Sequence, residues 1–248
     1  MQGYLPVPII AVVGSRKSGK TTTVEAITKE LTGRNYRVAT VKHINEPNFT
    51  INPKGKDTWR HAQAGAHITV GVAQKELAIV KKTDTTKLSL NDITQGIGSN
   101  TDIIITEGFR NLVKQDQTIP KIVSVKNRKE IEDATQTFKP ILAFTGSIAE
   151  TETLGLKIPY VDVQKEPKKL AEIIEKRVKP IIEKRREAKE TLTIDINNTM
   201  LPLNPYVQKV TRNVLMAIIS TLKGTTVKGN ENISIILEGN TLTDNADS

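Results

Sequence analysis

Short apolar runs alternate with helical stripes of apolar residues along the first part of the chain. Val7 to Val13 is apolar and β-branched and ends at Gly14, which is typical of a strand buried in a parallel sheet. The pattern then predicts a helix from Lys20, with Gly33 as its C-terminal cap. Tyr36 to Lys42 predicts a second strand. Such a strand, helix and strand in succession form a right-handed parallel crossover.

The middle of the chain predicts a long loop and a hairpin. Residues 43–56 are mostly polar and contain two prolines and a glycine, and a loop of this length favours a functional role over a plain connection. Asp57 to Ala64 predicts a short helix capped by Asp57 and stopped by Gly65. The β-rich runs 68–73 and 76–80 predict a hairpin.

Further strands and helices complete an α/β pattern. A helix is predicted over 88–97, and strands over 101–106, 122–125 and 141–144. A charged helix begins at Pro167 and continues past Pro180 to about residue 188. Alternating strands and helices predict an α/β, mostly parallel sheet with the P-loop NTPase fold.

The pattern changes after residue 190 toward a small α+β appendage. Short strands are predicted over 191–196 and 200–203, then a helix opened by Asn204-Pro205 and ended by Gly224, then a strand over 233–237. The chain is therefore expected to divide into a nucleotide-binding domain (1–165), a charged helical connector (166–190), a β-β-α-β appendage (191–239) and a flexible tail (240–248).

Composition narrows the class of protein. The 248 residues are 37% hydrophobic and 25% charged, which is ordinary for a globular protein, and no cysteine is present for disulfides or thiolate metal sites. No run approaches the roughly 20 apolar residues that cross a bilayer, so we expect a cytoplasmic protein. The net charge of +9 comes from basic residues interleaved with acidic ones, and Lys165 to Lys189 fits a solvated helix face better than a nucleic-acid groove.

The strongest motif is a P-loop of the form G-x-x-x-x-G-K-[ST], lying between the first strand and its helix. It comprises Gly14, Ser15, Arg16, Lys17, Ser18, Gly19, Lys20 and Thr21, and Thr22 follows it. Its backbone amides and the helix N-terminus attract phosphates. Lys20 is expected to contact the β- and γ-phosphates, and the Thr21 hydroxyl to bind Mg2+.

An acidic residue at the end of a neighbouring strand is needed on the metal side of such a site. Glu107 directly follows an isoleucine-rich run and precedes Gly108, which leaves room for a phosphate or water. Alternatively, Glu107 is an ordinary exposed acidic residue at the end of a strand. Asp102 begins the same strand, at the opposite edge of the sheet, so it is expected to be structural.

The second strand ends in Lys42-His43, at the sheet edge where open α/β folds bind ligands, although a surface pair explains two residues equally well. His61 and His67 have no carboxylate or thiol at ligand spacing and are expected to be structural. No Ser-His-Asp or Cys-His arrangement indicates a nucleophile.

Four ordered motifs, GSRKSGKTT, VATVKH, PKGKDTWRHAQAGA and DIIITEGFR, resemble the molybdopterin-guanine dinucleotide biosynthesis adaptor protein B (MobB) family over about residues 7–165. The resemblance implies a homodimeric GTP-binding protein that assists the molybdenum cofactor guanylyltransferase, with at most slow Mg2+-dependent GTP hydrolysis. It implies a phosphate-binding role for Gly14 to Thr22 and a strand-end motif at Lys42 and His43. It also implies a nucleotide-responsive loop at Gly55, Lys56 and Asp57, and a metal-side position at Glu107 and Gly108. Asp57 serves either as a helix cap or near the magnesium ion.

The chain departs from the family pattern in two places. The loop after His43 lacks the further His and Asp common in the family, and no Asn-Lys-x-Asp motif is present to read guanine, so guanine rests on the resemblance alone. A P-loop metallochaperone GTPase or small-molecule kinase is the alternative function, although three histidines and no cysteine count against metal delivery. A nucleic-acid-binding protein driven by the net charge is a third reading.

Overall fold

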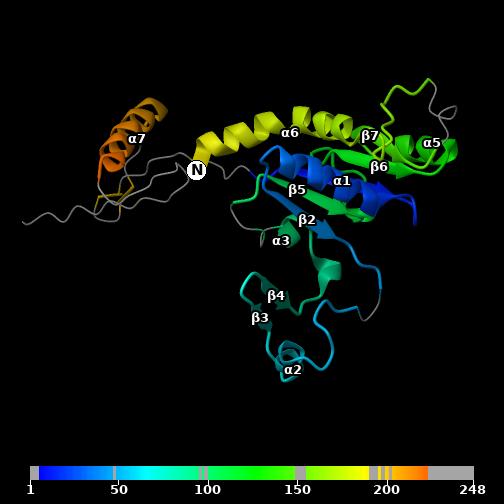
Figure 1. Ribbon diagram of the computed structural model, residues 1–248, viewed down its shortest axis with the longest axis horizontal. Helices are drawn as coiled ribbons and strands as arrows, with labels where there is room; N and C mark the ends of the chain where they lie inside the picture. The colour runs from blue at the N-terminus through cyan, green and yellow to red at the C-terminus, as the bar shows by residue number, and fades with distance from the viewer. Residues whose placement is uncertain are drawn as a thin grey trace, which may run out of the picture. The chain divides into compact units, whose positions relative to one another are not determined.

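Five parallel strands form the central sheet, in the order β2-β5-β1-β6-β7 (Figure 1). The computed structural model describes residues 6–46, 49–94, 97, 100–148, 155–189, 195–196, 199–200 and 203–222. The strands are β1 (Ile9–Gly14), β2 (Val38–Lys42), β5 (Ile103–Glu107), β6 (Lys121–Val125) and β7 (Ile141–Gly146). Every pairing within this sheet is parallel, so the predicted mostly parallel α/β fold is confirmed.

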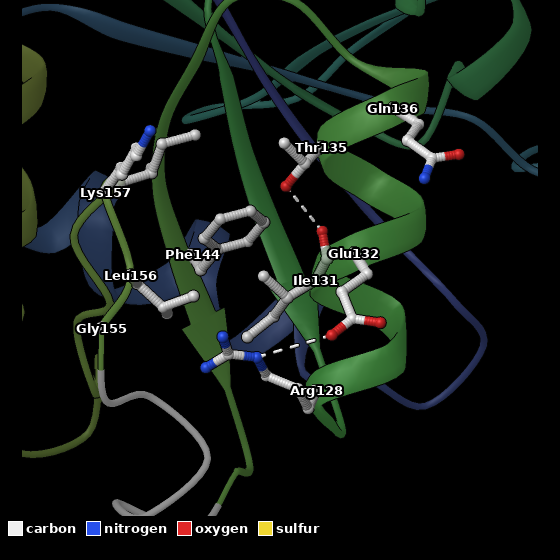
Figure 2. A pocket seen from close by; sticks show the side chains of 10 residues that line it. Arg128, Ile131, Glu132, Thr135, Gln136, Phe144, Gly155, Leu156 and Lys157 are labelled. Carbon is white, nitrogen blue, oxygen red and sulfur yellow. Dashed lines mark hydrogen bonds and ion pairs between the residues drawn. The ribbon is translucent and has the colours of Figure 1, made fainter.

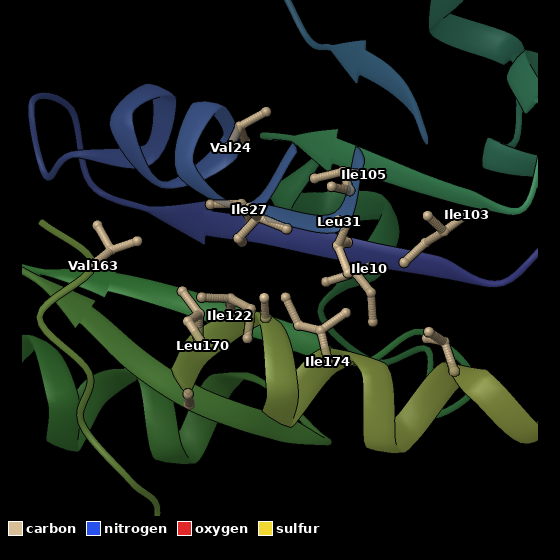
Figure 3. Packing of buried hydrophobic residues seen from close by; sticks show 14 of the residues in the cluster. Ile10, Val24, Ile27, Leu31, Ile103, Ile105, Ile122, Val163, Leu170 and Ile174 are labelled. Atoms are coloured by element: carbon tan, nitrogen blue, oxygen red, sulfur yellow. The ribbon is translucent and has the colours of Figure 1, made fainter. Parts of the chain in front are cut away.

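Helices α1 (Lys20–Gly33) and α6 (Pro167–Lys189) cover one face of the sheet. Figure 3 shows Ile27 and Leu31 of α1 meeting Ile10, while Leu170 and Ile174 of α6 pack from the other side of the cluster. All five side chains are fully buried, and each contributes roughly 1.5–3 kcal/mol on burial. The apolar cluster on this face is larger than the cluster on the opposite face.

The opposite face carries α3 (Leu90–Thr94), α4 (Arg110–Val113) and α5 (Arg128–Thr137), with a 3-10 turn at Thr85–Lys87 before α3. Strand residues alternate between the two clusters: Ile10 and Val12 face α1 and α6, whereas Ala11 and Val13 face α4 and α5. A sheet covered on both faces has strands that are apolar throughout, which explains the unbroken apolar runs.

The long loop after β2 leads to α2 (Asp57–Gln63) and an antiparallel hairpin of β3 (Ile68–Val72) and β4 (Leu77–Lys81). The predicted hairpin is confirmed. Thr69 is buried on the side where β3 contacts α2, whereas the neighbouring Ile68 and Val70 are exposed.

A second compact unit begins at Glu187. Its described elements are β8 (Asp195–Ile196), β9 (Thr199–Met200) and α7 (Pro205–Ser220). The Asn204 side chain accepts a hydrogen bond from the Val207 amide, so the predicted opening of this helix is confirmed. The predicted strand 233–237, the tail 240–248 and Gly224 lie outside the described residues.

Several predicted boundaries differ from the structure. Gly33 is the last residue of α1, and Asn35, with φ of 63°, takes the left-handed conformation instead. Asp57 lies inside the first turn of α2, and Lys56 is the N-cap, so the prediction of Asp57 as the cap is wrong. The helix predicted over 88–97 begins two residues later, at Leu90 of α3, and residues 95–96 lie outside the described residues.

The predicted connector is also placed differently. Helix α6 contributes buried side chains to the main core, and the first compact unit extends to Arg186 rather than ending near residue 165. No helix in the described part of the chain is long and apolar enough to cross a membrane.

Candidate functional site

The carboxyl ends of parallel strands meet at one edge of the sheet, and the predicted P-loop, strand-end and metal-side residues lie there. Gly14 ends β1, Lys42 ends β2 and Glu107 ends β5. The strand register places Glu107 between Val12 of β1 and Lys42 of β2. The structure therefore brings together three motifs that are far apart in the sequence.

The P-loop lies against the end of β6. Gly14 has φ of 153°, and a Cβ atom on it would lie 2.2 Å from the Ser124 carbonyl oxygen, so only glycine fits. The Ser124 hydroxyl donates a hydrogen bond to the Ser18 carbonyl oxygen. Lys17 takes a left-handed conformation, with φ of 60°. Contacts with β6 therefore help to hold the loop in its curved form.

Lys20 reaches back across the loop. Its Nζ donates to the Ser15 carbonyl oxygen at 2.6 Å. Burial lowers the pKa of Lys20, while the Glu107 carboxylate acts in the opposite direction. The hydroxyls of Ser15 and Ser18 are buried without a hydrogen-bond partner among the residues that the structure describes. A loop with polar groups free to bind and a basic side chain suits an anionic phosphate ligand.

Thr21, Glu107 and Lys42 form a polar cluster beside the loop. The Thr21 hydroxyl donates to Glu107 Oε1 at 2.9 Å, and Lys42 Nζ lies 3.0 Å from the same carboxylate oxygen. The Glu107 side chain is only 12% exposed. A hydroxyl and a carboxylate are the oxygen ligands that Mg2+ prefers, so these residues fit a magnesium ion.

His43 and Gly108 lie directly beyond this cluster. The His43 amide donates to the Glu107 carbonyl oxygen at 2.9 Å, and its ring lies 5.0 Å from the Phe109 ring, centroid to centroid. A Cβ atom on Gly108 would lie 3.0 Å from His43 Cβ. In the structure, Gly108 thus makes room for His43, and the approach of a phosphate or water to Gly108 stays a prediction.

Gly55, Lys56 and Asp57 make local contacts. The Lys56 amide donates to Pro53 at 3.3 Å, and the Asp57 carboxylate pairs with Arg60 at 3.6 Å. Among the described residues, no hydrogen bond or ion pair joins these three residues to the P-loop. Their response to a nucleotide therefore stays a prediction. The described residues also contain no group of three or more His, Asp or Glu side chains suited to a metal ion.

Two residues beside the P-loop are not indicated by the sequence pattern. Ser124 binds the P-loop from β6, and Lys126 Nζ lies 3.5 Å from the Arg16 carbonyl oxygen. Either would have been indicated by knowing that β6 is the neighbour of β1, but strand order is not written in the sequence. Asn127, beside Lys126, caps α5 by accepting from the Glu130 amide.

A pocket of about 350 Å3 lies elsewhere, between α5, β7 and residues 155–158 (Figure 2). Its floor includes Ile131 and Phe144, and its rim includes Arg128, which pairs with Glu132. No predicted site residue lines it. Because phosphates bind to backbone amides of a loop rather than to an apolar cavity, we place the functional site at the P-loop.

The parallel sheet, with a P-loop between β1 and α1, defines the class of P-loop NTPase-like proteins. The sequence also matches the family model described as Molybdopterin guanine dinucleotide synthesis protein B, over residues 9–146. The chain belongs to this family.

Individual relatives support the same family assignment. The chain is 28% identical to a putative molybdopterin-guanine dinucleotide biosynthesis adapter protein of Methanocaldococcus jannaschii, over 87% of this chain and 92% of the relative. It is 30% identical to the adapter protein of Haemophilus influenzae, over 68% and 88%. A crystal structure of molybdopterin-guanine biosynthesis protein B, 28% identical, superposes with a TM-score of 0.54, covering 69% of this chain and 99% of that one.

Proposed function

We propose that this protein is a GTP-binding adaptor that assists the guanylylation of molybdopterin. Family membership supports the pathway, because the relatives are named as adapters in molybdopterin-guanine dinucleotide biosynthesis. The observation that carries the nucleotide part is the convergence of Lys20, Thr21 and Glu107 beside the P-loop. A cytoplasmic location suits this biosynthetic role.

The chain's own groups suggest how a nucleoside triphosphate binds. The loop amides and Lys20 would hold the phosphates, and Thr21 and Glu107 would hold the magnesium ion. When bound, magnesium neutralises negative charge between the β- and γ-phosphates. Guanine is proposed because the family serves the synthesis of a guanine dinucleotide; no base-reading contact supports it within the described residues.

Hydrolysis is expected to be slow. Fast P-loop GTPases place an arginine against the developing charge of the transferred phosphoryl group. Arg110, the arginine nearest to Glu107 in the sequence, lies over the Phe138 ring, with its guanidinium carbon 4.9 Å from the ring centroid. This cation-π contact holds Arg110 against Phe138, so we do not assign this role to Arg110.

A titration with the molybdenum cofactor guanylyltransferase tests this function. We expect the wild-type protein to bind the transferase more tightly with Mg2+ and GTP than without them, and Lys20→Ala to lose the nucleotide-dependent part. Equal binding of wild type and variant under all conditions would contradict a nucleotide-controlled adaptor. ATP in place of GTP, at matched Mg2+, tests the choice of base.

The hairpin supports a homodimer. Its outer face carries Ile68, Val70, Val72, Leu77 and Ile79, which are 46–80% exposed. A two-stranded ribbon is marginally stable by itself, and α2 covers only its other side. We propose that a second copy of the chain covers this apolar face, because identical apolar surfaces can pair about a two-fold axis.

Light scattering after size-exclusion chromatography tests the homodimer. The wild-type protein should have twice the mass of one chain, and Val72→Asp should yield monomers. Thr86→Asp, a change outside the hairpin, serves as the charge control and should remain dimeric. A wild-type monomer at micromolar concentration, or a dimeric Val72→Asp variant, would rule out this interface.

A further inference from the structure

The Lys42 ammonium shares its contacts with the proposed magnesium site. Lys42 Nζ lies 3.0 Å from Glu107 Oε1 and 3.5 Å from Thr21 Oγ1. These two oxygens are the protein groups that fit the metal. A lysine ammonium thus lies in direct contact with both of them.

The hydrogen-bond directions show that the Thr21 oxygen is an acceptor toward Lys42. The Thr21 hydroxyl has one proton, which it donates to Glu107 Oε1 at 2.9 Å. Lone pairs on the Thr21 oxygen remain for a cation, and the Lys42 ammonium, which has only donors, lies against that oxygen. A magnesium ion bound to Thr21 needs a lone pair of the same oxygen and the charge of the same carboxylate.

We propose that Lys42 is a built-in competitor of magnesium, whose ammonium must leave Thr21 and Glu107 when the metal binds. This inference rests on the proposed Mg2+-nucleotide site and adds to it a residue that sets how strongly binding depends on the metal. Two cations in contact with the same hydroxyl oxygen and the same carboxylate oxygen lie close enough to repel each other strongly.

The position of Lys42 links this exchange to the rest of the site. Lys42 is the last residue of β2, and its register partner is Glu107. The next residue, His43, begins the loop that leads to α2. Lys42 Nζ and the His43 amide both bind Glu107, so a metal ion on Glu107 would act one residue from the start of that loop.

The Lys42 side chain is 55% exposed, so it can leave the cluster without unpacking the core. An ammonium near the phosphates also supplies positive charge where the metal would. Lys42 is therefore expected to support nucleotide binding when magnesium is absent and to oppose the metal when it is present.

The test measures binding of a fluorescent GTP analogue by the full chain, over a range of Mg2+ concentrations and in EDTA. Lys42→Met should lower the Mg2+ concentration for half-maximal binding about fivefold, the range expected for loss of a partly exposed charged contact. The same variant should bind the analogue more weakly than wild type in EDTA.

Lys29→Met is the control, since it removes one positive charge from an exposed position on α1, without a contact with the P-loop, Thr21 or Glu107. Its half-maximal Mg2+ concentration should shift less than twofold. Equal shifts in the two variants would show a general charge effect and overturn the inference. So would a Lys42→Met variant that is folded by circular dichroism but loses binding at saturating Mg2+.

Failure of the proposed function can be distinguished from failure of the inference about Lys42. If wild type bound no nucleotide, the function would be wrong, and Mn2+ titration without nucleotide would still test the competition. Lys42→Met should bind Mn2+ more tightly than wild type and Lys29→Met, as followed by water proton relaxation. Equal Mn2+ affinities in all three proteins would overturn the inference.

Discussion

At the scale of single residues, the course of the P-loop depends on Gly14, a position where only glycine fits. Gly14 approaches the Ser124 carbonyl oxygen so closely that an added Cβ would lie 2.2 Å away, against a backbone atom that cannot rotate aside. Gly33, at the end of α1, has no atom within 4 Å of an added Cβ. The two glycines thus serve different purposes.

Substitution by alanine should separate these two glycines. Gly14→Ala should lower the free energy of unfolding by about 2 kcal/mol and abolish nucleotide binding, because the loop must shift. Gly33→Ala should raise it by about 0.5 kcal/mol, since alanine favours the helix. Urea denaturation and a GTP titration check both. A Gly14→Ala variant with normal stability and binding would contradict the described loop.

Asp102 lies at the opposite edge of the sheet from the P-loop, where its buried carboxylate pairs with two arginines. Its carboxylate accepts from Arg37 Nε at 3.1 Å and lies 3.2 Å from an Arg186 nitrogen. Burial would raise the pKa of Asp102, but the Arg37 hydrogen bonds and the Arg186 charge outweigh burial and hold the pKa below its ordinary value. The structural role predicted for Asp102 is confirmed.

The sign of the pKa shift predicts how stability depends on pH. A depressed carboxyl pKa stabilises the fold above the unfolded-state pKa of about 3.9, and this stability is lost as the pH falls through the folded-state pKa. Asp102→Asn should cost about 2 kcal/mol at pH 7 and less at pH 3. Urea denaturation at the two pH values measures this. An equal cost at both would show that the charge is not responsible.

At the scale of elements, α6 belongs to the core. Leu170, Ile174 and Val178 are buried against the sheet, and Glu175 pairs with Arg34 at 2.6 Å. Tyr36 donates to the other Glu175 oxygen at 2.8 Å, and burial together with Glu175 raises the pKa of Tyr36 to about 12. The helix is therefore held by both apolar and polar contacts.

Two isoleucines of α6 test this placement. Ile174 is fully buried, whereas Ile181 is 37% exposed. Ile174→Ala should lower the free energy of unfolding by about 3 kcal/mol, and Ile181→Ala by less than about 1 kcal/mol. If both variants had the same small effect in urea denaturation, α6 would be a detachable connector instead of part of the core.

The helices and strands show what the sequence can predict. Apolar runs indicated all five strands of the sheet, and the strand-end rule indicated that Glu107 and Lys42 would meet the P-loop. Helices α4 and α5 were not predicted, although Asn127 followed by Glu130 is a helix-opening signal. The Ser124 contact needs strand order, and the placement of α6 needs tertiary packing, neither of which periodicity provides.

At the scale of the whole molecule, the site lies in the first compact unit, which makes up three quarters of the chain. The match to the Methanocaldococcus jannaschii relative covers 87% of the chain and so extends into the second unit, whereas the Haemophilus influenzae relative covers 68%. At least part of the second unit is thus aligned with the Methanocaldococcus jannaschii relative, beyond the family match at residues 9–146. We assign the nucleotide chemistry to the first unit.

Calorimetric titration of GTP with Mg2+ into wild type, Lys20→Ala and Glu107→Gln tests whether the P-loop and Glu107 bind a magnesium nucleotide. We predict saturable binding to wild type, at least tenfold weaker binding to Lys20→Ala, and loss of the Mg2+ dependence in Glu107→Gln. Tighter binding of GTP than ATP would support guanine. Undiminished GTP binding by Lys20→Ala would contradict the account, since the P-loop would then not be the nucleotide site.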